Sequence, residues 1–139
     1  MVMRQPRLFV GDDNPEIGEL IHDIALPLDL EPVIITNSTE FKSQWLANKP
    51  DILVLDMVMP NMDGFDLIQW LAQITCDVPI ILISGREELY AKAASKVGRT
   101  KGLNIPYVLS KPFSVIEMET ALKDALKMSL TDTVCSFGA

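Results

Sequence analysis

The chain has 139 residues, of which 48% are hydrophobic and 22% are charged, so it has enough apolar surface for one compact domain. Its formal net charge of −7 argues against direct binding to nucleic acid, whose phosphate backbone requires clustered Lys and Arg. Neither a signal peptide nor a membrane span is expected, because no apolar run longer than Leu8–Val10 follows Met1–Pro6. The cytoplasm is therefore the expected compartment. The separated Cys76 and Cys135, with the single histidine His22, predict free or buried thiols rather than a soft metal site.

Short apolar runs alternate with longer segments whose apolar residues recur at helical spacing, which indicates βα units and a mostly parallel sheet. The runs are rich in Val, Ile and Leu without polar alternation, as expected where helices cover both faces of the sheet. Five strands are predicted, at Leu8–Val10, Val33–Thr36, Ile52–Leu55, Ile80–Ile83 and Tyr107–Leu109.

Capping residues and prolines predict five helices. An N-cap asparagine followed by proline begins the first helix, and a later proline ends it. Two capping boxes, in which each side chain satisfies a backbone N–H of the first turn, begin the second and fifth. The expected helices are Pro15–Leu26, a second starting at Asn37 and Glu40, Phe65–Ile74, Glu87–Val97, and a fifth starting at Ser114 and Glu117.

This order of elements predicts an α/β fold: a flavodoxin-like, doubly wound, five-stranded parallel sheet with strand order 2-1-3-4-5 and five helices. Its ligand crevice lies outside the carboxyl ends of strands one and three, where the order reverses. We expect the domain over residues 7–128, an N-terminal extension over 1–6, and a C-terminal tail or linker stub over 129–139.

Three carboxylates follow these two strands: Asp12 and Asp13 after the first, and Asp56 after the third. Like charges this close are costly in a low dielectric unless a cation or protons compensate. Oxygen-only ligands with room for water and a substrate oxygen match Mg²⁺ better than zinc or calcium. The sequence therefore predicts a magnesium site at this edge.

The next two strands add a hydroxyl and an ammonium group. Strand four ends in Ser84 and Gly85, and strand five in Ser110, Lys111 and Pro112. A serine and a lysine facing a metal-bound aspartate would hold the three equatorial oxygens of a phosphoryl group during transfer. The natural nucleophile is the aspartate of strand three.

These segments resemble the receiver domains of response regulators. Gly11-Asp12-Asp13-Asn14 resembles their acidic pair, and the segment Leu55–Gly64 resembles their phosphoacceptor loop. Ser84-Gly85 and Lys111-Pro112-Phe113 resemble the two later signatures, and the resemblance spans roughly residues 7–128.

The resemblance implies a phosphorylation-dependent signalling switch that catalyses only its own phosphorylation and slow dephosphorylation. Asp13 and Asp56 would ligate Mg²⁺ directly, the backbone carbonyl of Val58 would complete the protein ligands, and Asp12 would act partly through water. Ser84 and Lys111 would contact the phosphoryl oxygens.

The implied phosphoryl donor is the phosphohistidine of a histidine kinase or phosphotransfer protein. The implied response is a change in the surface around helix four, strand five and helix five. An output domain or downstream effector would read this surface, without membrane contact or direct nucleic-acid binding by this segment.

Two features depart from the family pattern. Receivers usually carry an aromatic three residues before the lysine, whereas this chain has Val108 there and Tyr107 one residue earlier. Because strand side chains alternate, Tyr107 should point to the opposite face from Val108, and we expect the signal to reach helix four through shifts around Gly85–Tyr90.

The connection from Ser84 to Lys111 is also longer than usual, which predicts an enlarged fourth helix or exit loop. Such connections resemble those of receivers fused to cyclic-dinucleotide phosphodiesterase outputs.

Other interpretations stay open. Taken singly, Asp12 and Asp13 would be a solvated turn or a helix cap. Ser84 alone would cap a helix, and Lys111 alone would be a surface charge. A phosphatase that forms an aspartyl phosphate usually has a second aspartate two residues after the nucleophile, where this chain has Val58. A flavin or nucleotide carrier should have a phosphate loop rich in glycine and hydroxyls after strand one. The last alternative is a receiver used only for docking.

Overall fold

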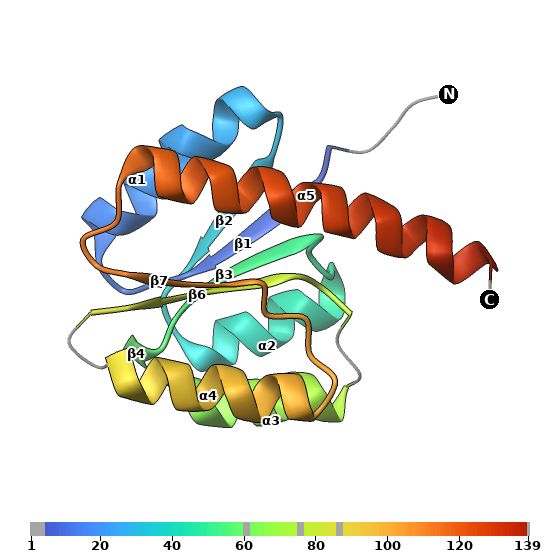
Figure 1. Cartoon of the computed structure of the whole chain (residues 1–139). Coiled ribbons are helices and arrows are strands. Elements are labelled where there is room, and N and C mark those ends of the chain that lie inside the picture. The colour runs from blue at the N-terminus through green and yellow to red at the C-terminus, as the bar shows by residue number, and fades with distance from the viewer. Residues whose placement is uncertain (1–4, 60–61, 75–76, 86–87, 139) are drawn as a thin grey trace.

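In the computed structural model, which describes residues 5–59, 62–74, 77–85 and 88–138, five parallel strands form one sheet in the order β2-β1-β3-β6-β7 (Figure 1). This is the predicted doubly wound sheet with strand order 2-1-3-4-5. Of the segments discussed above, residues 1–4, Pro60, Asn61, Cys76, Arg86, Glu87 and Ala139 lie outside the described residues.

All five predicted strands are present, and each differs from its predicted bounds by one or two residues. The two central strands each gain one residue at the carboxyl end, so that Asp56 and Ser84 are the last residues of their strands. The edge strand begins two residues early, at Glu31, and tolerates Pro32 because an edge position leaves one side of the backbone unpaired. The strands are β1 Arg7–Gly11, β2 Glu31–Ile35, β3 Ile52–Asp56, β6 Ile80–Ser84 and β7 Tyr107–Ser110.

The helices begin where the capping residues predicted. Asn14 and Asn37 accept hydrogen bonds from first-turn N–H groups at 2.9 and 2.8 Å. At Ser114 and Glu117 each side chain accepts from the other residue's backbone N–H, at 3.0 and 2.9 Å. The helices are α1 Pro15–Ala25, the short 3-10 turn η1 Leu26–Leu28, α2 Ser38–Ala47, α3 Gly64–Gln73, α4 Glu88–Thr100 and α5 Val115–Gly138.

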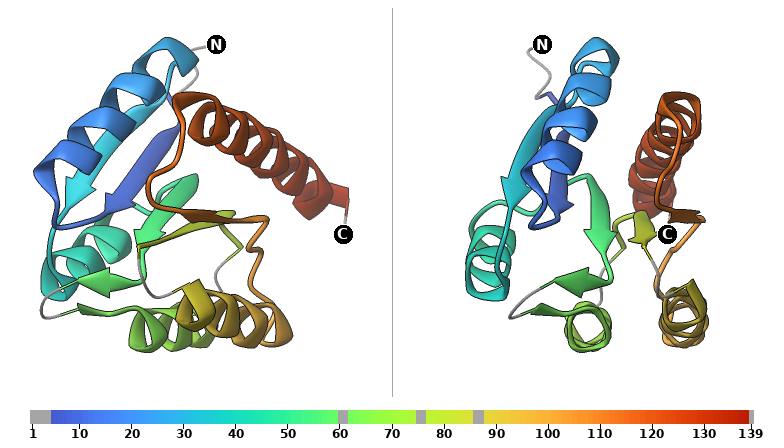
Figure 2. Two further views of the ribbon diagram at one scale, coloured as in Figure 1. Left: turned by 60° about the vertical axis from the view of Figure 1, so that its left-hand side comes forward. Right: turned by 90° about the vertical axis from the view of Figure 1, so that its left-hand side faces the viewer.

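The sheet separates two apolar cores. Helices α1 and α5 cover one face, and α2, α3 and α4 cover the other, as the turned views in Figure 2 show. Side chains of β3 alternate between them: Leu53 and Leu55 join the core beneath α2, α3 and α4, whereas Ile52 and Val54 join the core beneath α1 and α5. Both faces of the central strands are therefore buried, which explains their continuous apolar sequence.

Helix α4 runs three residues beyond the predicted Val97 because Gly98 lies inside it and does not end it. A Cβ at Gly98 would lie 2.7 Å from Cδ1 of Ile105, so this glycine permits close packing. The helix ends at Thr100, and the turn that follows it contains Gly102, which has a φ of 95°. The N–H of Gly102 donates to the carbonyl of Arg99, and the N–H of Leu103 donates to the carbonyl of Gly98. These two hydrogen bonds form a Schellman motif. Helix α4 therefore has 13 residues.

Helix α5 continues past residue 128, where the receiver domain was expected to end. Residues 129–138, expected as a tail or linker stub, continue the helical backbone, because neither Gly nor Pro interrupts the sequence before Gly138. The far end projects past the sheet in Figure 1. Among the described residues, no helix is both long enough and apolar enough to cross a membrane.

The core predicts a contrast between two leucines. Leu53 is fully buried, whereas Leu46 on α2 is 73% exposed. Leu53→Ala should lower the free energy of unfolding by about 2–5 kcal/mol, because it removes buried contacts and leaves a cavity. Leu46→Ala should change it by less than about 0.5 kcal/mol. Urea denaturation followed by circular dichroism measures both, and equal losses would contradict this core.

Candidate functional site

Three carboxylates meet at the edge of the sheet where the strand order reverses. Asp12 directly follows β1 and Asp56 ends β3, and these two side chains are buried, at 1% and 5% exposure. Asp13 is exposed. One carboxylate oxygen from each of the three lies within 4.8 Å of the others. The structure therefore brings together the three acids that the sequence placed at these strand ends.

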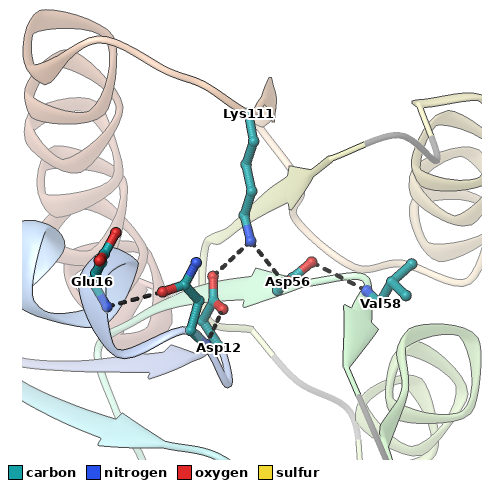
Figure 3. Close-up of polar contacts among 6 residues, drawn as sticks. Asp12, Glu16, Asp56, Val58 and Lys111 are labelled. Carbon is teal, nitrogen blue, oxygen red and sulfur yellow. Dashed lines mark hydrogen bonds and ion pairs between the residues drawn. The ribbon is translucent and has the colours of Figure 1, made fainter.

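The side chain of Lys111 reaches into this group from the end of β7 (Figure 3). Its Nζ lies 2.9 Å from Oδ2 of Asp56 and 3.0 Å from Oδ2 of Asp12. The backbone N–H of Lys111 also donates to the carbonyl of Ser84 at 2.6 Å, which ties the end of β7 to the end of β6. One ammonium group thus bridges two buried carboxylates from different strands.

Local hydrogen bonds orient the two buried acids. Oδ1 of Asp12 accepts the N–H of Asn14 at 2.9 Å, and Asn14 in turn caps α1. Oδ1 of Asp56 accepts the N–H of Val58 at 3.1 Å (Figure 3). Each side chain is therefore fixed by the turn that follows its strand.

The pKa values reflect the burial and the pairing. Burial raises the pKa of Asp56, and the nearby charge of Asp12 raises it further, against hydrogen bonds from Lys111 and Val58 that lower it. Burial acts to lower the pKa of Lys111, but its hydrogen bonds to Asp56 and Asp12 prevail and raise it. Lys111 is accordingly a fixed cation, and a second cation would further stabilise the ionised acids.

The donor set fits a hard divalent ion. All three side chains offer carboxylate oxygens, and no described histidine or cysteine joins them. Val58, whose backbone carbonyl the resemblance adds as a ligand, lies two residues after Asp56 in the short hairpin of β4 (Val58–Met59) and β5 (Met62–Asp63). Oxygen ligands with one side open to water are the arrangement that suits Mg²⁺.

Ser84 offers a hydroxyl without a partner. Its side chain is 1% exposed, and its Oγ makes no hydrogen bond to any described residue. A buried polar group left unpaired costs about 1–3 kcal/mol, so a ligand oxygen beside it would be favourable. The next residue, Gly85, has open space where a side chain would stand. A buried hydroxyl and a residue with open space beside it therefore follow each other at the end of β6.

The two residues that depart from the family pattern lie on opposite faces, as predicted. Val108 packs against the core beneath α2, α3 and α4, and Tyr107 packs against the core beneath α1 and α5. The hydroxyl of Tyr107 donates to Asp124 of α5. Tyr107 is thus held on the face of the sheet away from α4.

Sequence reasoning missed one polar contact beside the site. The hydroxyl of Tyr90 on α4 donates to Oδ1 of Asp63 at 2.6 Å. The Asp63-Gly64 pair does signal a helix start, since Asp63 caps α3 by accepting the N–H of Phe65. Nothing in the sequence, however, links it to a tyrosine 27 residues away.

Comparison with known proteins shows which family this chain resembles. A family model described as the response regulator receiver domain matches residues 8–123. The transcriptional regulatory protein KdpE of Staphylococcus aureus is 32% identical over 120 residues, which cover 86% of this chain and 49% of KdpE. The transcriptional regulatory protein BaeR of Escherichia coli is 25% identical over 124 residues, which cover 88% of this chain and 48% of BaeR. This chain spans about half the length of these relatives.

Solved structures show the same fold. A response regulator receiver domain protein from Clostridium thermocellum superposes with a TM-score of 0.74 at 25% identity, covering 88% of this chain and 94% of that one. The signal receiver domain of an HD domain-containing protein from Pseudomonas fluorescens superposes with a TM-score of 0.82 at 22% identity. The match covers 96% of this chain and 95% of that one. Because the family match extends over residues 8–123 of the 139 and the chain folds as these receivers do, it belongs to the response regulator receiver domain family.

Proposed function

We propose that this receiver domain is a phosphorylation switch in which Asp56 accepts a phosphoryl group beside Mg²⁺. The observation that carries the proposal is the position of Asp56, which is buried beside the carboxylates of Asp12 and Asp13 and lies 2.9 Å from the ammonium of Lys111. A carboxylate held between a cation site and a fixed positive charge is suited to attack phosphorus, because both neighbours attract the oxygens of the incoming group.

Asp12, Asp13, Asp56 and the backbone carbonyl of Val58 would hold the ion, with Asp12 acting partly through water. When bound, Mg²⁺ would neutralise the carboxylates and the phosphoryl oxygens. The buried pair needs this compensation, since Lys111 supplies one positive charge for two acids and Asp13 adds a third acid.

In the transfer, a carboxylate oxygen of Asp56 attacks phosphorus and the bond between phosphorus and the donor nitrogen breaks. The electron pair stays on the donor imidazole. Lys111 and Ser84 would hold the phosphoryl oxygens, a role supported by the central position of Nζ and by the unpaired hydroxyl. Val58 stands where an aspartyl phosphatase has its acid, so we propose slow hydrolysis and an aspartyl phosphate that persists as a signal.

The donor in this proposal is a histidine kinase or phosphotransfer protein, and the compartment is the cytoplasm. Residues 7–128 form the receiver, and residues 129–139 lead from it toward an output domain or face a downstream effector. Phosphorylation changes the surface of α4, β7 and α5. KdpE and BaeR are transcriptional regulatory proteins about twice as long as this chain, so a transcriptional output is one candidate for the pathway.

Asp56→Asn should abolish phosphoryl incorporation, because an amide is neither a nucleophile toward phosphorus nor an anionic ligand. The protein is incubated with Mg²⁺ and acetyl phosphate, and the gain of one phosphoryl group is measured by intact mass spectrometry. Asp66→Asn, which removes an exposed acid of α3, is the control and should be labelled like the wild type. Persistent labelling of the Asp56→Asn variant would remove Asp56 from its assigned role.

Mg²⁺ should raise the free energy of unfolding of the wild type, because an ion that binds only the folded chain stabilises it, by about 2.7 kcal/mol at a concentration of 100 times Kd. Asp13→Ala should erase this gain. Glu19→Ala removes an exposed acid of α1 and should retain it. Thermal melts with Mg²⁺ or with EDTA measure the difference, and equal Mg²⁺ shifts in wild type and Asp13→Ala would refute the metal assignment.

A further inference from the structure

The first turn of α4 is attached to the phosphoacceptor loop through one tyrosine. The hydroxyl of Tyr90 donates to Oδ1 of Asp63 at 2.6 Å, and its ring packs edge-on against Phe65, with centroids 5.0 Å apart and planes at 66°. Burial, with the hydrogen bond to Asp63 next, raises the pKa of Tyr90, so its hydroxyl keeps its proton at neutral pH. Helices α3 and α4 lie side by side in Figures 1 and 2.

Asp63 is in turn bound to the segment that leaves Asp56. It pairs with Val58 across the β4–β5 hairpin. The next residue, Gly64, packs directly on Met57, since a Cβ there would lie 2.7 Å from the carbonyl oxygen of Met57. The start of α3 therefore lies in close contact with the backbone next to Asp56.

The residue that usually carries the signal in this family is a valine here. Val108 packs against the same core as Tyr90 and Phe65, but its short, β-branched side chain has restricted χ1 freedom. Tyr107 is bound to Asp124 on the other face. A weaker contact of 3.4 Å joins Ser110 to Glu88, also in the first turn of α4.

We propose that Tyr90 couples occupancy of the Asp56 site to the first turn of α4, through its hydrogen bond to Asp63. The inference rests on the proposed function and deepens it by naming the residue that carries the response. Filling the site alters the backbone from Asp56 to Val58, the paired Asp63 follows, and Tyr90 transmits the change to α4. Tyr90 is a positioning residue, since it does not touch the reacting group.

The experiment compares backbone amide spectra of ¹⁵N-labelled wild type and Tyr90→Phe, with and without Mg²⁺ and beryllofluoride, a mimic of the phosphoryl group. Tyr90→Phe removes one hydroxyl and keeps the ring contact with Phe65. At saturating mimic, both proteins should show shifts at Asp13 and Lys111. Shifts over Glu88–Lys92 should fall by roughly half or more in the variant, because coupling between two sites requires a contact that responds to both.

Tyr107→Phe is the matched control, since it removes the corresponding hydroxyl on the other face and should leave the α4 shifts as in wild type. Asp63→Asn retains an oxygen that accepts from Tyr90 and should retain the α4 shifts as well. Undiminished α4 shifts in Tyr90→Phe would overturn the proposal. Loss of the α4 shifts in Asp63→Asn but not in Tyr90→Phe would also overturn the proposal. The charge of Asp63, rather than its hydrogen bond with Tyr90, would then carry the response.

Failure of the underlying function has a separate signature. If wild type shows no shift at Asp13 or Lys111 with Mg²⁺ and beryllofluoride, the phosphoryl site itself is refuted, and the coupling with it. If those amides shift and only the Tyr90→Phe comparison fails, the switch stands and the coupling residue is wrong.

Discussion

The structure of the site depends on the pairing of one ammonium group with two buried carboxylates. Asp12 and Asp56 come from adjacent strands, and neither would remain ionised in an apolar interior without a positive neighbour. Lys111 supplies that charge from a third strand, at 2.9 and 3.0 Å. The ends of β1, β3 and β7 are thereby held together by electrostatics as well as by the sheet. The exposed Asp13 leaves the group short of positive charge, which is why we propose a divalent cation at this site.

The sequence was informative wherever strand ends decided the geometry. Carboxyl ends of parallel strands meet at one edge, so Asp12, Asp13, Asp56, Ser84 and Lys111 could be placed together without knowing any loop. Capping residues likewise located the starts of α1, α2 and α5, because these hydrogen bonds are local and involve residues two or three apart. Strand alternation was enough to separate Tyr107 from Val108.

What the sequence could not supply were contacts between helices and the exact helix ends. The fourth helix was predicted to end at Val97, yet in the structure the next residue, Gly98, packs closely against Ile105 and the helix continues to Thr100. The contact between Tyr90 and Asp63 depends on how α3 and α4 lie against each other, which no periodicity in one helix reveals. Both cases involve packing between elements distant in sequence, where side-chain shape decides the outcome.

The unbroken course of α5 has a geometric consequence. A helix rises about 1.5 Å per residue, so residues 129–138 extend the arm by about 15 Å. Each residue also turns the helix by about 100°, so its length sets both reach and angular phase. Removing a single residue would rotate the far end by about 100°, whereas removing seven would restore its orientation to within about 20° while shortening the arm by about 10 Å. The length of a stiff helix therefore fixes the rotation of its far end about the helix axis. A surface that contacts this end would be sensitive to that rotation.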